Sequence, residues 1–229
     1  MSKTIFLTSS LDLSFEDELG IKHAHKFTNL NKLQENFKKF IKKFDNFLYV
    51  ASIENNNENN DFRFELTKQS FNLTMPFKKY YLLDGRTKNK AKELINKADF
   101  IFLCGGHVPT QNEFFTKIGL KELLKNYNGV ICGSSAGSMN CANIVYAAPE
   151  LEGEATNPNF ERYINGLGLT NINIIPHFDD VKNTYLDGKH FLNDILLTDS
   201  FKKEIVAFSD GTYILINNKA LTIFGRHLL

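Results

Sequence analysis

The chain has 229 residues, a formal net charge of +1 and 42% hydrophobic residues, which fits one large α/β domain over residues 1–229. This balance gives no reason to expect nucleic acid or a membrane surface as a partner. No apolar stretch approaches the roughly 18 residues of a membrane span, and the N-terminal segment lacks the long apolar region of a signal peptide. The three cysteines suit reduced thiols, so we expect a cytoplasmic protein.

Short apolar runs alternate with helix-spaced apolar residues, which predicts a mostly parallel sheet with crossover helices. We expect strands at 5–8, 47–53, 80–83, 99–104, 130–132 and 172–175. We expect helices near 30–44, 62–73, 88–97, 110–127 and 185–198, with a solvated turn at 55–61. Three closing strands are expected at 205–208, 213–216 and 220–224, partly antiparallel because the turns between them are short.

The most informative motif is Gly133-Ser134-Ser135-Ala136-Gly137, which directly follows the apolar run 130–132. Gly-x-Ser-x-Gly at a strand-to-helix junction is the pattern of a nucleophile elbow. The turn is too sharp for side chains beside the nucleophile, so glycines flank Ser135. An ordinary Gly/Ser turn is the alternative interpretation of the five residues taken alone.

Two further segments follow predicted strands and should lie near Ser135. His177 comes after the strand at 172–175, and it is the best-placed base to take the proton of a serine hydroxyl. Gly105 and Gly106 follow the strand at 99–104 and let the backbone approach a substrate closely. His107 stands beside them and is a candidate to line the pocket. Open α/β sheets bind ligands at this carboxyl edge.

Three motifs in order make the chain resemble the family of serine peptidases that contains dipeptidase E and cyanophycinase. They are Cys104-Gly105-Gly106, the elbow around Ser135, and Pro176-His177-Phe178. The resemblance covers most of the chain. It implies a class I glutamine-amidotransferase-like fold, which is a three-layer α/β sandwich with a mostly parallel central sheet.

The same resemblance implies roles for individual residues. Ser135 matches the nucleophile and His177 the general base, and the backbone amides of Gly106 and Ala136 would form the oxyanion hole. The family's acidic triad member follows the elbow helix, and Glu150 lies at the corresponding distance.

Glu152 and Glu154 are close enough in sequence to Glu150 to be rivals for the acidic position. An acid in that role orients the imidazole and stabilises its charged form. The alternative for all three glutamates is a solvated acidic loop.

The expected reaction is hydrolysis of dipeptides or small amino-acyl amides, and the resemblance suggests an acidic N-terminal residue. Asp179 and Asp180 add negative charge that disfavours such a residue, and both are candidates to hold a substrate ammonium group. No cofactor and no metal is expected. The partner is a small peptide substrate, and a homodimer is left open. The competing hypothesis is a non-catalytic or regulatory module, supported by Cys104 in place of the first family glycine.

Overall fold

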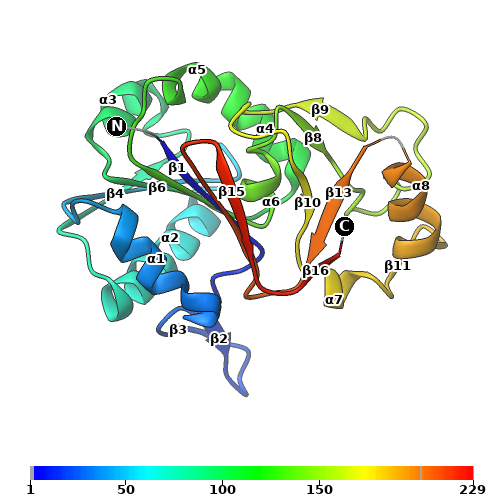
Figure 1. The fold of residues 1–229 in the computed structure, drawn as a ribbon, viewed down its shortest axis with the longest axis horizontal. Coiled ribbons are helices and arrows are strands. Elements are labelled where there is room, and N and C mark those ends of the chain that lie inside the picture. Colours follow the sequence, from blue (N-terminus) through cyan, green and yellow to red (C-terminus); the bar gives the residue numbers. More distant parts are fainter. Residues whose placement is uncertain (1–2, 202, 229) are drawn as a thin grey trace.

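The computed structural model describes residues 3–201 and 203–228. Its centre is a seven-stranded sheet with the strand order β15-β14-β1-β7-β6-β4-β5 (Figure 1). The strands are β1 (Thr4–Thr8), β4 (Asn46–Val50), β5 (Lys79–Leu83), β6 (Phe100–Leu103), β7 (Val130–Ser134), β14 (Tyr213–Asn217) and β15 (Ala220–Phe224). The five strands from β1 to β5 in this order are parallel, whereas β14 and β15 are antiparallel to their neighbours.

The order in which the chain visits these strands explains the layers. It moves outward from β1 to β4 and β5, and then returns through β6 to β7. Right-handed crossovers therefore place the outward and the returning helices on opposite faces of the sheet. Figure 1 shows α1 and α2 on one side and α3, α4 and α5 on the other, so the three-layer α/β prediction is confirmed. The helices are α1 (Leu33–Phe40), α2 (Asn57–Thr74), α3 (Ala91–Lys97), α4 (Val108–Lys117) and α5 (Leu120–Leu124).

Aromatic side chains fill the space between the sheet and α2. Phe47 on β4 lies 4.7 Å from Phe71 of α2 and 5.2 Å from Phe100 of β6, measured between ring centroids. All three are fully buried, and such contacts add to the hydrophobic energy of burial. This packing holds α2 against β4 and β6.

A smaller three-stranded sheet lies beside the large one. It consists of β10 (Asn173–Ile175), β13 (Ile205–Phe208) and β16 (His227–Leu228), with β10 and β13 parallel. The parallel pair ends at one edge, so the residues that follow β10 and β13 come close together. Three two-stranded hairpins complete the strands: β2 (Ser14–Glu16) with β3 (Lys22–Ala24), β8 (Ile144–Tyr146) with β9 (Tyr163–Asn165), and β11 (Tyr185–Leu186) with β12 (Lys189–His190).

The remaining helical segments are short. They are η1 (Leu30–Lys32), η2 (Lys88–Lys90), α6 (Ala136–Met139), α7 (Phe178–Val181), η3 (Phe191–Leu196) and α8 (Leu197–Ser200). Within residues 3–201 and 203–228, no helix is both long enough and apolar enough to cross a membrane.

Several predicted elements differ from the structure for local reasons. The helix expected at 110–127 is two helices, because Gly119 has a φ of 65° and ends the first one. The turn expected at 55–61 is largely the first turns of α2, whose side-chain cap is Asn56. The helix expected at 185–198 begins as the β11–β12 hairpin, turned by Asp187 and Gly188 at φ values of 52° and 76°.

Candidate active site

Ser135 occupies a strained turn between β7 and α6. Its φ and ψ are 51° and −121°, a backbone conformation that non-glycine residues rarely adopt. A Cβ on Gly133 would lie 2.6 Å from Ser138 Cα, and one on Gly137 would lie 2.1 Å from the carbonyl oxygen of Leu103. Only glycine fits at either position, so the structure contains the elbow that the motif predicts.

Ser9, at the end of β1, connects the elbow to the smaller sheet. The backbone amide of Ser135 donates to the carbonyl oxygens of Thr8 and Ser9, at 3.0 Å each. The Ser9 hydroxyl donates to Asp210 Oδ1 at 2.5 Å and accepts from the backbone amide of His177 at 2.7 Å. Ser9 is fully buried. Nothing in its sequence context marks it, yet it contacts all three polar residues of the site.

His177 and Asp210 form an ion pair at the edge of the smaller sheet. His177 follows β10 and Asp210 follows β13, and His177 Nδ1 lies 2.8 Å from Asp210 Oδ1. This bond raises the pKa of His177 above its usual value, against the effect of partial burial. Burial disfavours the charge of Asp210, but the bonds from His177 and Ser9 outweigh it and lower the pKa of Asp210. The carboxylate thus holds one imidazole nitrogen and leaves Nε2 free.

Two backbone amides beside Ser135 have no acceptor among the described residues. They belong to Gly106, in the turn after β6, and to Ala136, the first residue of α6. A Cβ added to Gly105 would lie only 3.1 Å from Ser135 Cβ, so the glycine turn closely approaches the elbow. Unpaired amides next to a nucleophile are the donors that an oxyanion requires.

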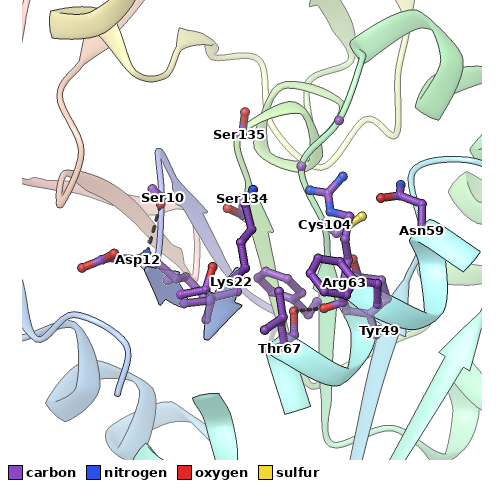
Figure 2. A pocket seen from close by; sticks show the side chains of 18 of the residues that line it. Ser10, Asp12, Lys22, Tyr49, Asn59, Arg63, Thr67, Cys104, Ser134 and Ser135 are labelled. Atoms are coloured by element: carbon purple, nitrogen blue, oxygen red, sulfur yellow. Dashed lines mark hydrogen bonds between the residues drawn. The ribbon is translucent and has the colours of Figure 1, made fainter. Parts of the chain in front are cut away.

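Ser135 and His177 line the same cavity, which has a volume of about 490 Å³ (Figure 2). It opens at the carboxyl ends of β4, β6 and β7, and α2 forms one wall. The helices that follow β4 and β6 cover opposite faces of the sheet, and a ligand crevice is expected where adjacent strands diverge in this way. No hydrogen bond joins the Ser135 hydroxyl to His177 in the described residues, and such contacts are often loose before substrate binds.

The family model of peptidase family S51 matches residues 19–224. The chain belongs to peptidase family S51. No curated protein sequence matches it significantly.

Two solved structures share the fold of this S51 peptidase. One is a candidate peptidase E protein from Listeria monocytogenes EGD-e, with 17% identity, full coverage of both chains and a TM-score of 0.63. The other is a peptidase from an acI-B1 Actinobacterium, with 15% identity, 99% of this chain and 88% of that chain covered, and a TM-score of 0.66. At these identities the likeness concerns the fold, and the family assignment makes the chain a serine-type peptidase.

The acidic partner of His177 in this S51 peptidase is Asp210, which corrects the assignment of Glu150 to that position. Glu150 is near enough to His177 that its charge contributes to the raised pKa of the imidazole. The residue as a whole is exposed, but desolvation of its carboxyl group and the charge of Glu154 raise the pKa of Glu150 to about 7, against the opposing charge of His177. Glu152 is exposed and makes no contact with the imidazole.

His107 and Glu154 join two loops of the peptidase. His107 Nε2 lies 2.9 Å from Glu154 Oε1, and its Nδ1 lies 2.8 Å from Thr110 Oγ1. The other oxygen of Glu154 accepts from the backbone amides of Glu150 and Leu151 at 2.8 and 2.9 Å. His107 does not line the cavity of Ser135, so its contacts hold the 150–154 loop to the glycine turn.

Asp179 and Asp180 are not among the residues that line the cavity. Asp179 pairs with Lys182 at 2.6 Å and accepts a hydrogen bond from the Ser209 hydroxyl, so it has partners within the protein. In residues 3–201 and 203–228, the one group of side chains with the spacing of metal ligands is His177, Asp180 and Asp210, whose atoms lie within 4.8 Å of one another. The ion pair between His177 and Asp210 accounts for that proximity.

Two basic residues of the cavity were not predicted from the sequence. They are Lys22, on β3, and Arg63, on α2. Figure 2 shows the guanidinium of Arg63 between α2 and the Ser135 elbow. Neither residue lies in a motif, and only the packing of α2 and the β2–β3 hairpin brings them to the site.

Proposed function

We propose that this S51 peptidase hydrolyses dipeptides or small amino-acyl amides through Ser135, His177 and Asp210. The observation that carries the proposal is the cavity that Ser135 and His177 share, with Asp210 bound to the far side of the imidazole. Each of the three proposed catalytic residues follows a strand. The nucleophile follows β7 of the large sheet, and the base and the orienting acid follow β10 and β13 of the smaller sheet.

The catalytic steps follow from this arrangement. His177 takes the proton of the Ser135 hydroxyl through Nε2, because Asp210 holds Nδ1. The serine oxygen then attacks the substrate carbonyl, and the amides of Gly106 and Ala136 stabilise the oxyanion. His177 returns the proton to the leaving amine, and water hydrolyses the acyl-enzyme by the same base.

The size of the cavity supports a small substrate. Its volume of about 490 Å³ lies in the range of pockets that enclose small ligands. Asp12 is the acidic side chain that lines the cavity, so it is the group placed to attract a free amino terminus, in place of the predicted Asp179. If this cavity encloses the substrate on one side of Ser135, a long peptide substrate has no room to bind there.

A screen of free-amino dipeptides, their N-acetylated forms and denatured casein tests the proposal. Of the three substrates, wild-type protein should hydrolyse only the free-amino dipeptides. Ser135→Ala should lower the rate of hydrolysis by about 10³-fold or more and leave the free energy of unfolding unchanged. Equal cleavage of all three substrates would contradict the small-substrate model. Unchanged turnover in Ser135→Ala would remove the serine from the mechanism, and no turnover at all would favour the non-catalytic module.

A further inference from the structure

Arg63 presents an unpaired charge to the cavity of Ser135. Its side chain is half-buried, and its guanidinium has no hydrogen-bond acceptor and no carboxylate partner among the described residues. The other arginines with described side-chain contacts differ in this respect. Arg86 pairs with Asp61 and Asp84, and Arg162 approaches Asp199. A guanidinium carries five donors in a planar fork, so an unpaired one in a cleft fits an anionic ligand.

The guanidinium lies close to the reacting atoms. A Cβ built on Gly105 would lie 3.1 Å from Ser135 Cβ and 3.7 Å from Arg63 Nη2. A Cβ on Gly106 would lie 4.0 Å from Arg63 Nη1. The space of one methyl group thus separates the elbow from the guanidinium. A substrate bound at Ser135 therefore has the guanidinium of Arg63 within reach of its neighbouring atoms.

Arg63 lies on a face of α2 that lines the cavity, and a second positively charged side chain lines the same cavity. Asn59, Arg63 and Thr67 lie four residues apart on α2 and line the cavity as one helix face. The Thr67 hydroxyl donates to the Arg63 carbonyl oxygen at 2.8 Å. Lys22 of β3 lines the same cavity and has no ion pair within the described part of the chain. The acidic side chain there, Asp12, lies 3.2 Å from His25 Nε2.

We propose that Arg63 binds a carboxylate of the substrate and thereby determines which peptides this enzyme cleaves. The inference rests on the proposed peptidase function and adds a residue that selects the substrate. A carboxylate accepts two parallel bonds from a guanidinium, which gives both orientation and affinity. Lys22 adds a second positive charge on the opposite wall of the same cavity.

Two parts of a dipeptide carry this chemistry: an acidic side chain on the first residue and the C-terminal carboxylate. Four peptides separate them, namely Asp-Leu, Ala-Leu and the C-terminal amides of both. Arg63→Gln should lower kcat/KM by about tenfold to a hundredfold for the peptides that carry the recognised carboxylate, and leave the others unchanged. A loss confined to the two Asp peptides identifies the side chain. A loss confined to the two free acids identifies the C-terminus.

Lys68→Gln is the matched control, because Lys68 is also on α2 but pairs with Glu65 at 3.0 Å outside the cavity. It removes the same charge from the same helix and should leave all four kcat/KM values unchanged. Arg63→Lys keeps the charge without the fork and should recover part of the loss. The inference would be overturned if Arg63→Gln lowered kcat/KM equally for all four peptides. It would also be overturned if Lys68→Gln lowered kcat/KM as much as Arg63→Gln does.

A binding measurement separates failure of this inference from failure of the proposed function. Calorimetry of Asp-Leu with Ser135→Ala protein needs no turnover. Adding Arg63→Gln to that protein should weaken binding by about tenfold or more. Binding that is equal in the two proteins, or absent from both at millimolar peptide, would overturn the inference whatever the wild-type enzyme hydrolyses.

Discussion

The two sheets contribute different halves of the active site. The seven-stranded sheet supplies the elbow of Ser135 and the glycine turn at Gly106, and close contacts leave no room for a side chain on the glycines of either turn. The three-stranded sheet supplies His177 and Asp210, which lie at its exposed edge. In the proposed mechanism, the first half presents the nucleophile and the amide donors, and the second half moves the proton.

The comparison shows where the site depends on tertiary structure. Within the large sheet, the Ser135 turn needs only local glycines and the neighbouring strand ends. Between the sheets, the site depends on Ser9, which binds the amide of Ser135 through its carbonyl and both residues of the ion pair through its hydroxyl. Changes in the smaller sheet should therefore alter proton transfer, whereas changes at Ser9 should alter the alignment of the two halves.

The largest effect is expected from Asp210→Asn. Removing the carboxylate removes the main cause of the raised pKa of His177 and the partner of its charged form. The value of kcat/KM should fall by about 10²- to 10⁴-fold. The acid limb of its pH profile should move to lower pH, because the pKa of His177 falls.

Asp180→Asn is the control for Asp210→Asn. Asp180 contributes to the raised pKa of His177 by its charge alone, so its removal should shift the acid limb slightly and leave the plateau rate nearly unchanged. Similar losses in the two variants would show that Asp210 has no special role in orienting the imidazole.

An intermediate effect is expected from Ser9→Ala. The variant leaves the His177 amide without its acceptor and Asp210 without one donor, which should cost about 1–3 kcal/mol of unfolding free energy. Misalignment of the two halves should lower kcat by about tenfold. Urea unfolding and steady-state kinetics measure the two effects.

Ser138→Ala provides the comparison for Ser9→Ala. The Ser138 hydroxyl is also buried and also makes two hydrogen bonds, but both join it to Thr8 at 2.8 Å. It should lose similar stability with a much smaller fall in kcat. A fall in kcat in Ser138→Ala equal to the fall in Ser9→Ala would contradict the bridging role of Ser9.

The smallest effect is expected from Glu150→Gln. Its charge raises the pKa of His177 only as a minor cause, so the acid limb should move to lower pH by less than in Asp210→Asn. The folded-state pKa of Glu150 is about 7 against an ordinary 4.5, so the folded protein retains a proton that the unfolded chain has lost. Stability from this group is therefore present below pH 4.5 and lost as the pH rises through about 7.

Unfolding free energies measured from pH 4 to 8 test the second effect. The wild-type value should fall more steeply over this range than the value for Glu150→Gln. Glu152, two residues further along the same loop, is the matched control, and Glu152→Gln should follow the wild-type slope. A slope in Glu150→Gln that equals the wild-type slope would contradict the raised pKa of Glu150.

The elbow of Ser135 could be predicted from sequence because its geometry is local. The glycines that the turn requires lie in the same five-residue motif as Ser135, and an apolar run directly precedes the motif. His177 could be predicted for the same reason, as a polar residue directly after a buried strand. The alternating pattern of the first 134 residues also predicted the strands of the parallel sheet.

The other polar residues of the site could not be predicted because their roles depend on packing. Asp210 lies 33 residues after His177, and the strand that it follows was expected among the closing strands but belongs to the smaller sheet. Arg63 reaches the cavity only because the buried aromatic side chains hold α2 against β4 and β6. The hairpin at Asp187-Gly188 was predictable from its turn residues, and helical periodicity was followed instead.

Covalent labelling with a fluorophosphonate tests the central claim most directly, because the reagent reacts only with an activated hydroxyl held beside a base. Intact-mass analysis should show one adduct on the wild-type protein, located on Ser135 by peptide mapping. Asp210→Asn should label more slowly, and Ser135→Ala should not label at all. An unlabelled wild-type protein, or equal labelling of Ser135→Ala, would contradict the assignment of Ser135 as the nucleophile.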